Sequence, residues 1–157
     1  MSTLADITEL LSIGRQRAEA GSLPYAGAFT PSETFALLTA QPQAILVDVR
    51  TNAERDWVGR VAIDAQQHAA VQWTSYPDGL PNPDFLDQLA LVADKNTTIL
   101  FLCRSGVRSR HAATLAAAHG YAACFDILEG FEGDKDAAGH RKSVGGWCKA
   151  DLPWVGA

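Results

Sequence analysis

The stretch "TTILFLCRSGVRSRHAATLAAAHG" (residues 97–120) contains the pattern of a strand, a sharp turn and a helix in direct succession. Residues 97–102 are short, apolar and rich in β-branched side chains, which is typical of a central strand. The alanine-rich run after the turn predicts a helix that ends at Gly120. Because strands that alternate with helices build parallel sheets, this stretch indicates an α/β fold.

The same alternation continues on both sides of this stretch. Two capping boxes, Thr30 with Glu33 and Thr51 with Glu54, each mark the start of a helix. We expect helices over 4–20, 30–40, 51–57 and 82–92, strands over 44–49, 97–102 and 122–128, and an ambiguous short strand within 65–71. Residues 21–29 are predicted to be an irregular or short extended link, and the chain after 128 a loop with one helical turn near Trp147. The sequence therefore predicts a central, mostly parallel sheet with helices on both faces.

The length of 157 residues suits one domain with one full core. Residues 1–29 are predicted to form an N-terminal helical extension, with Leu4, Ile7, Leu10 and Leu11 along one helix face. Residues 30–157 are predicted to form the main domain. The sequence contains no internal repeat and no low-complexity linker.

The composition narrows the possible partners and compartments. A net charge of −5 and an ordinary share of charged residues (20%) make nucleic acid an unfavourable partner. We expect no signal peptide and no membrane interaction, because the N-terminus lacks a basic segment before an apolar run. The widely spaced cysteines 103, 124 and 148 indicate neither a metal cluster nor a disulfide framework. A cytoplasmic location is expected, in which Cys103 can remain a free thiol.

The chemistry of the sequence is concentrated at Cys103, where the strand of residues 97–102 ends. Ligands of open α/β sheets bind beyond this end of the strands. The first amides of the following helix have no partner within the helix, so they attract anions and favour a nucleophilic thiolate. Gly106 allows the loop to curl so that successive N–H groups point inward. Arg104 and Arg108 add positive charge that suits an oxyanion.

Three motifs resemble those of the rhodanese-type sulfurtransferases. The segment "CRSGVRS" (103–109) is similar to the active-site loop of that family, Cys-Arg-x-Gly-x-Arg followed by Ser or Thr. The segment "LVDVRTNAE" (46–54) resembles the Val-Asp-x-Arg segment of the family, and "LEGF" (128–131) with "GGW" (145–147) resembles its C-terminal Gly–Trp region. The resemblance covers residues 30–154 and implies a rhodanese-like domain.

The resemblance also implies a reaction. Cys103 would attack the outer sulfur of a donor such as thiosulfate, keep it as a persulfide, and pass it to cyanide or a thiol. The implied active-site loop consists of Arg104, Ser105, Gly106, Val107, Arg108 and Ser109. Arg104 would hold the sulfonate of thiosulfate, and Arg108 would complete the loop. The partners would be small molecules, and no metal or organic cofactor is required.

Two other functions remain open. Phosphatases and arsenate reductases of the same fold separate the cysteine and arginine by one residue more than the four found between Cys103 and Arg108. The shorter loop favours a single sulfur atom over a phosphate. The insertion at 131–144 motivates a second alternative, a persulfide carrier or docking module that receives sulfur from a sulfur-relay protein and turns over small molecules poorly.

Several further residues have two readings each. Asp48 either pairs with an arginine and supports the loop or caps a neighbouring helix, and Arg50 either lines the pocket or lies at a solvated edge. The sequence departs from the family pattern at segments such as "GRV" (59–61), which are expected to form the walls of the pocket rather than the reactive loop. We expect the aromatic residues Trp73, Phe131 and Trp147 to be core, Cys124 and Cys148 to be structural, and His111 to face solvent.

Overall fold

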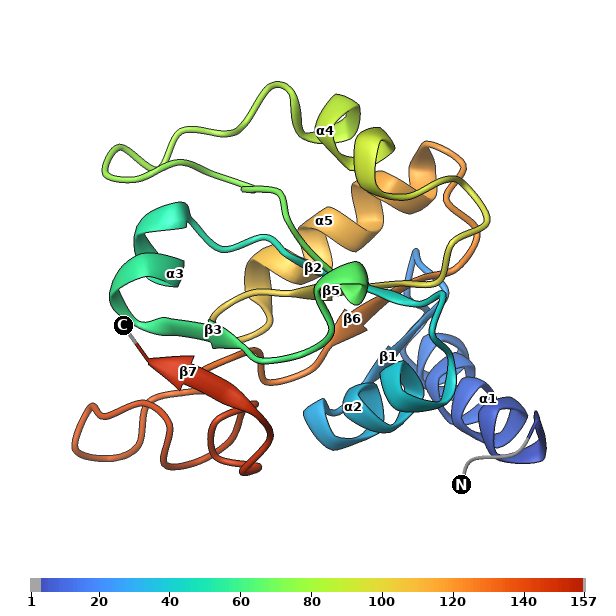
Figure 1. The fold of residues 1–157 in the computed structure, drawn as a ribbon, viewed down its shortest axis with the longest axis horizontal. Coiled ribbons are helices and arrows are strands. Elements are labelled where there is room, and N and C mark those ends of the chain that lie inside the picture. The colour runs from blue at the N-terminus through green and yellow to red at the C-terminus, as the bar shows by residue number, and fades with distance from the viewer. Residues whose placement is uncertain (1–3, 157) are drawn as a thin grey trace.

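The computed structural model describes residues 4–156, except for the side chains of Leu4 and Ala5. Five parallel strands form the central sheet in the order β1-β6-β5-β2-β4, and β3 pairs with β7 in a small antiparallel sheet (Figure 1). The helices are α1 (Leu4–Gly21), α2 (Pro31–Ala40), α3 (Asn52–Trp57), α4 (Phe85–Val92) and α5 (Val107–Ala118), with a 3-10 turn at Ala65–Gln67. The strands are β1 (Gly27–Phe29), β2 (Ile45–Asp48), β3 (Gly59–Val61), β4 (His68–Ala70), β5 (Ile99–Leu102), β6 (Cys124–Ile127) and β7 (Trp154–Gly156).

Helices cover both faces of the central sheet, as the sequence predicts. Helices α4 and α5 lie on one side of the sheet and α1 and α2 on the other (Figure 1). Alternate residues of β5 enter two separate cores: Phe101 packs with the α4–α5 side, whereas Leu100 and Leu102 pack with the α1–α2 side. Every residue of β5 is buried, which explains why residues 97–102 read as a continuous apolar run.

The predicted helix starts are confirmed at α2 and α3 but not at α4. Thr30 and Thr51 each form a complete capping box with the glutamate three residues later. Asn82 does not cap α4, because its side chain accepts a hydrogen bond from the Asp84 N–H and closes a turn instead. Helix α4 therefore begins at Phe85, after Asp84.

Strand β1 lies within residues 21–29, for which an irregular or short extended link was predicted. It pairs with β6 at an edge of the central sheet, so the segment 1–29 contributes a strand as well as helix α1. Gly27 permits this arrangement, because a Cβ atom on it would lie 2.3 Å from the Gly14 carbonyl oxygen of α1. Ile7, Leu10 and Leu11 of α1 pack against the core, as expected from their shared helix face.

The prediction of a loop after residue 128 is wrong for β7, which pairs antiparallel with β3. Near Trp147 the chain forms hydrogen-bonded turns over 147–151, in which the Ala150 N–H donates to the Gly146 carbonyl at 3.0 Å, the spacing of the single helical turn that was predicted. Trp147 is fully buried, and its indole N–H donates to the Pro153 carbonyl. Helix α3 ends at Trp57 with Val58 as its C-cap, and Gly59, which follows directly, opens β3 with a φ of +137°.

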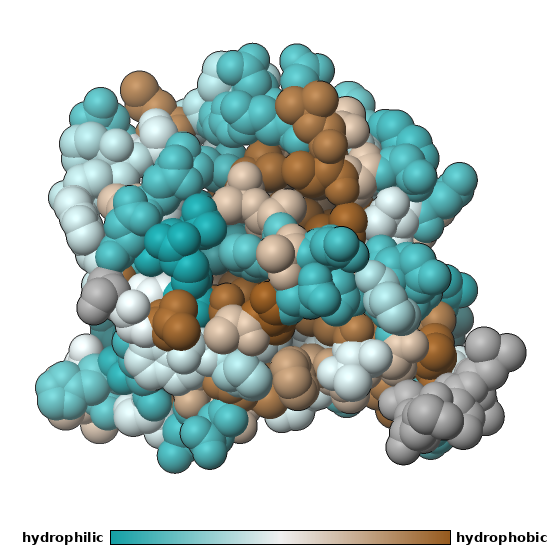
Figure 2. Space-filling view, viewed as in Figure 1, coloured by the Kyte–Doolittle hydropathy of each residue, from teal (hydrophilic) through white to brown (hydrophobic). Residues whose placement is uncertain are grey.

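On the face shown in Figure 2, hydrophobic side chains gather in the upper part, where α4 lies. Leu91 of α4 is 86% exposed. Among residues 4–156, none of the helices has the length and apolar content that crossing a membrane requires.

Candidate active site

Cys103 follows the last residue of β5 and opens the loop that leads into α5. Only 1% of the residue is exposed, and its Sγ accepts a hydrogen bond from the Gly106 N–H at 3.0 Å. Gly106 has a φ of +107°, a left-handed conformation that glycine adopts without strain, and it directly precedes α5. The loop thus curls around the sulfur atom, as predicted from the position of the glycine.

A cavity of about 280 Å³ lies at this loop and is lined by Cys103, Arg104, Ser105, Val107 and Arg108. Arg104 and Val107 are exposed, whereas Ser105 and Arg108 are partly buried. All five lining residues belong to the loop that the sequence identified. The cavity therefore gives a small reactant access to the otherwise buried thiol.

The segment after β6 is hydrogen-bonded to the backbone of the active-site loop. The N–H groups of Phe131 and Glu132 donate to the carbonyls of Cys103 and Arg104 at 2.8 and 2.9 Å, and the Gly133 N–H also donates to the Arg104 carbonyl, at 3.2 Å. Two motifs that are far apart in the sequence, 103–109 and 128–133, therefore form one structural unit.

Arg108 does not point freely into the cavity. Its guanidinium forms a two-point ion pair with Glu54 of α3, with Nη1–Oε1 and Nη2–Oε2 distances of 2.7 and 2.8 Å. Burial would raise the pKa of Glu54, but the hydrogen bonds and charge of Arg108 outweigh it and hold that pKa at about 2. The sequence identified Glu54 only as a helix cap, because nothing in the local pattern connects it to Arg108.

The Glu54–Arg108 pair predicts a pH-dependent stability. Because the folded-state pKa of Glu54 lies below its ordinary value, the stabilisation is present above about pH 4.5 and is lost as the pH falls toward 2. The difference corresponds to about 3 kcal/mol. Urea unfolding from pH 7 to pH 3 should show about 2 kcal/mol of this loss in the unaltered protein, because the full loss is reached only below pH 2, and a flatter profile in Glu54→Gln.

Glu19→Gln is the control for this experiment, since Glu19 is an exposed residue on α1. Its profile should follow that of the unaltered protein. Equal pH slopes for Glu54→Gln and the unaltered protein would show that the ion pair contributes no stability.

A buried hydrogen-bond chain runs from Cys103 to β6. The Cys103 thiol donates to the Ser109 Oγ at 3.3 Å, and the Ser109 hydroxyl donates to Asp126 Oδ1 at 2.5 Å. Burial raises the pKa of Asp126 to about 6, and the Ser109 hydrogen bond and the charge of Arg110 offset part of that rise. Sequence reasoning missed Asp126, although an aspartate within the apolar run "CFDIL" was a detectable signal.

Asp48 and Arg50 form a fully buried ion pair at the end of β2. Arg50 donates to Asp48 through Nε at 3.0 Å and Nη2 at 2.8 Å, and Nη2 also reaches the Gly59 carbonyl at 2.8 Å. The guanidinium carbon lies 4.3 Å from the centre of the Phe131 ring. Arg50 is 0% exposed, so it does not lie at a solvated edge, and it is not among the residues that line the cavity at Cys103.

The other candidates lie outside the cavity lining. Phe131 and Trp147 are fully buried in the core, and partly buried Trp73 packs edge-on against Phe85. His111 is exposed, as predicted, and stacks on Trp73. Burial raises the pKa values of Cys124 and Cys148 to about 11, so neither thiol ionises appreciably at neutral pH.

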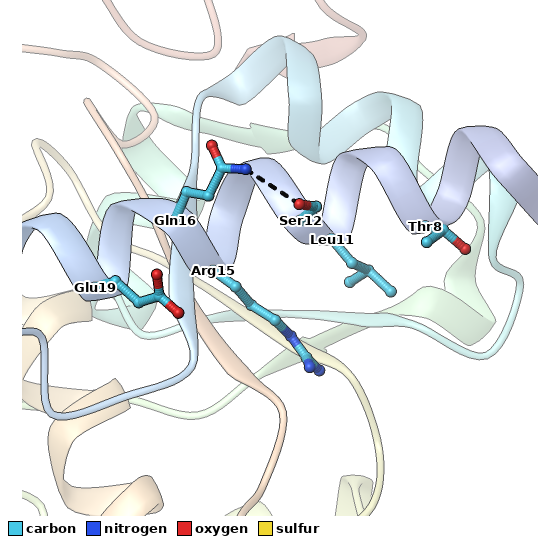
Figure 3. A pocket seen from close by; sticks show the side chains of 6 residues that line it. All are labelled: Thr8, Leu11, Ser12, Arg15, Gln16 and Glu19. Atoms are coloured by element: carbon cyan, nitrogen blue, oxygen red, sulfur yellow. Dashed lines mark hydrogen bonds between the residues drawn. The ribbon is translucent and has the colours of Figure 1, made fainter.

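A second hollow, of about 360 Å³, runs along α1. Figure 3 shows the six side chains that line it, all of them from this one helix, with Gln16 donating to Ser12. They are Thr8, Leu11, Ser12, Arg15, Gln16 and Glu19. None of these six is a cysteine or histidine, and no second element contributes to the lining, so the loop at Cys103 is the better candidate for chemistry.

Comparison with known proteins identifies the family of this chain. The sequence model of the rhodanese-like domain matches residues 30–137. The chain is 36% identical to an uncharacterised protein of Rickettsia conorii over 126 residues, covering 78% of this chain and 92% of the relative. It is 31% identical to the thiosulfate sulfurtransferase GlpE of Haemophilus influenzae over 127 residues, covering 79% and 90%.

Solved structures show the same fold. The crystal structure of Rv0390 from M. tuberculosis has 39% sequence identity and a TM-score of 0.77, and the match covers 83% of this chain and 98% of that one. The matched family model spans most of the chain and includes the 103–109 loop, and the relatives include a sulfurtransferase. The predicted family and fold are thereby confirmed: this chain belongs to the rhodanese-like domain family.

Proposed function

We propose that this protein is a sulfurtransferase that moves a sulfane sulfur from thiosulfate or a related donor to a thiophilic acceptor, through a persulfide on Cys103. The observation that carries the proposal is the surroundings of the Cys103 sulfur. The Sγ is buried, it accepts a hydrogen bond from the Gly106 N–H, and a small cavity opens onto it. The match to GlpE, a thiosulfate sulfurtransferase, supports the same reaction class.

In the first step, the Cys103 thiolate attacks the outer sulfur of thiosulfate. A new S–S bond forms, the bond to the sulfonate sulfur breaks, and sulfite leaves with the electron pair. The unpaired N–H groups at the start of α5 stabilise the negative charge of the terminal persulfide sulfur. In this step the protein supplies the nucleophile and the positive charge that faces the anionic donor.

In the second step, the thiolate of an acceptor attacks the outer persulfide sulfur. The acceptor leaves as a persulfide, and Cys103 is released as a thiolate. Cyanide would react in the same way and leave as thiocyanate. The donor leaves before the acceptor binds, and only the persulfide sulfur links the two half-reactions. Ping-pong kinetics are therefore expected.

Arg104 is the residue suited to bind the sulfonate. In the described part of the chain, Arg108 is paired with Glu54, whereas no carboxylate lies within ion-pair distance of Arg104. Arg104 is exposed and lines the cavity, so its charge is available to an incoming anion. The four residues between Cys103 and Arg108 give a ring that suits one sulfur atom rather than a phosphate.

A persulfide carrier in a sulfur-relay pathway is the second candidate, and the position of the 131–144 insertion favours it. The insertion begins with the N–H groups that hold the carbonyls of Cys103 and Arg104, so a partner protein that docks on it would adjoin the reactive loop. Small-molecule acceptors would then be poor substrates. The free thiols at 103, 124 and 148 suit a reducing compartment such as the cytoplasm.

Intact-mass measurement after incubation with thiosulfate tests the proposed reaction. We expect an adduct of one sulfur atom that cyanide or a thiol removes. Cys103→Ser should abolish the adduct, and Cys148→Ser, which removes the partly buried thiol outside the cavity, should leave it intact. An adduct that survives Cys103→Ser, or none in the unaltered protein, would falsify the proposal.

A turnover assay separates the two candidates. An enzyme that uses small molecules should convert thiosulfate and cyanide to thiocyanate at many cycles per minute. A carrier should load rapidly from a cysteine desulfurase but show almost no thiosulfate:cyanide turnover. Hydrolysis of an aryl phosphate that depends on Cys103 would instead indicate a phosphatase.

A further inference from the structure

In the hydrogen-bond chain Cys103–Ser109–Asp126, both bonds have the same donor-to-acceptor direction. The thiol donates to the Ser109 Oγ, and the Ser109 hydroxyl donates to Asp126 Oδ1. Cys103, Ser109 and Asp126 are all buried, with exposures of 1%, 0% and 1%, so this chain offers the thiol proton a path that does not pass through bulk water. Each donor–acceptor step therefore leads from the sulfur toward the carboxylate.

Loading a sulfur atom creates a charge problem at this buried site. In the hydrogen-bond chain the Cys103 sulfur is the donor to Ser109 and so carries its proton, whereas the persulfide carries a negative charge on its terminal sulfur. A charge added to a buried site costs free energy unless another charge is neutralised nearby. If the thiol proton remains on the neighbouring carboxylate, the net charge of the site is the same before and after loading.

We propose that Asp126 stores the thiol proton of Cys103 while the protein carries sulfur, with Ser109 passing that proton in both directions. The inference rests on the proposed persulfide reaction and assigns a role to a residue outside the family motif. Asp126 acts through Ser109 and does not touch the substrate.

The proton balance closes over the two half-reactions. On loading, the Cys103 proton passes to Ser109 as the Ser109 proton passes to Asp126, and the resulting thiolate attacks the donor and expels sulfite. On unloading, the acceptor removes the outer sulfur and Cys103 leaves as a thiolate. Asp126 then returns its proton through Ser109, which restores the thiol.

The surroundings of Asp126 suit a carboxylate that gains and loses a proton. Tyr25, which precedes β1, and Arg110 of α5 interact electrostatically with it, Cys103 lies beyond Ser109, and Cys124 precedes it on β6. Among residues 4–156, no cation lies within ion-pair distance of Asp126, in contrast to Asp48, which forms an ion pair with Arg50. Its pKa of about 6, raised mainly by burial, brings protonation within reach near neutral pH.

Infrared difference spectroscopy tests the proposal directly. The spectrum of the sulfur-loaded protein minus that of the reduced protein should contain the carbonyl stretch of a protonated carboxylic acid. Asp126→Asn should lack this band, and Asp136→Asn should keep it. Asp136 is the matched control, because it accepts a hydrogen bond from Ser143 at 2.6 Å in an exposed loop.

Kinetics of the loading half-reaction provide the second readout. Asp126→Asn and Ser109→Ala should each slow loading at pH 7 by about 10²-fold, and the double variant should be no slower than either. In the unaltered protein, the loading rate should fall as the pH drops through about 6, because protonated Asp126 accepts no proton. This fall should be absent in Asp126→Asn, whose rate rises steadily as hydroxide takes over the role of the base.

The two failures are distinguishable. If the mass adduct forms but no carboxylic acid band appears, Asp126 does not store the proton, although the persulfide reaction stands. A loss of rate in Asp126→Asn that is equal at every pH would indicate a merely structural role and would also overturn the proposal. If no adduct forms, the proposed function itself fails.

Discussion

Gly130→Ala is expected to abolish sulfur loading and to lower the free energy of unfolding by about 3 kcal/mol, the sum of backbone strain and a steric clash. Gly130 has a φ of +66°, and a Cβ atom on it would lie 2.5 Å from the Arg104 carbonyl carbon and oxygen and 2.6 Å from the Cys103 oxygen. These are backbone atoms of the active-site loop, so they cannot rotate away. The loop would have to move, and the hydrogen bond from Gly106 to the sulfur would move with it.

Gly79→Ala is the matched control for this prediction. Gly79 has a φ of +67°, but no atom lies within 4 Å of the position of its Cβ. This variant therefore carries the backbone strain alone, about 1 kcal/mol, and should load sulfur normally. Urea unfolding and the intact-mass assay measure both effects. Equal results for the two variants would mean that the contact between residue 130 and the loop is unimportant.

Asp48→Asn is expected to lower the free energy of unfolding by about 3–5 kcal/mol, because it leaves the Arg50 guanidinium buried without a counter-charge. Arg50 is 0% exposed, and two of its nitrogens already depend on the Asp48 carboxylate. The remaining nitrogen, Nη1, is buried without a hydrogen-bond partner, so it provides no substitute contact when the carboxylate is removed. Arg50→Met should cost less, because the Arg55 Nε lies 3.8 Å from Asp48 Oδ2 and still faces the carboxylate that this substitution leaves behind.

A double-mutant cycle isolates the interaction between these two residues. The variant Asp48→Asn with Arg50→Met should be less destabilised than the sum of the single variants, since the buried charge is removed together with its partner. Asp56→Asn is the control, because it removes a carboxylate from the exposed Arg60–Asp56 pair and should change the stability little. Strict additivity in the cycle would contradict the ion-pair explanation.

Much of the fold follows from local sequence patterns. The β-branched run at 97–102 becomes β5, and the capping boxes at Thr30 and Thr51 start α2 and α3 where predicted. These features are predictable because burial on both faces of a strand and the capping of a helix impose their own residue choices within a few positions. The loop at 103–109 is predictable for the same reason, since its glycine, cysteine and arginines are contiguous.

The contacts between distant segments were not predictable in this way. Strand β1 is a three-residue run, "GAF", with no apolar alternation of its own, and its pairing depends on α1 and β6 being in place. Likewise β7 becomes a strand only through β3. Such short strands have little intrinsic preference, so tertiary pairing decides their conformation.

The sequence by itself determined the candidate reactive group: a cysteine at the end of a buried strand, a glycine whose N–H donates to the sulfur, and a helix that follows directly. These depend on neighbouring residues and on backbone geometry. Only the tertiary structure decided which charges act on that sulfur. It paired Arg108 with Glu54, and it placed the Asp126 carboxylate within hydrogen-bond distance of Ser109. Ion pairs and hydrogen bonds depend on distance in space rather than in sequence. Because α3 and β6 approach the loop only when the sheet forms, the local sequence does not reveal these partners.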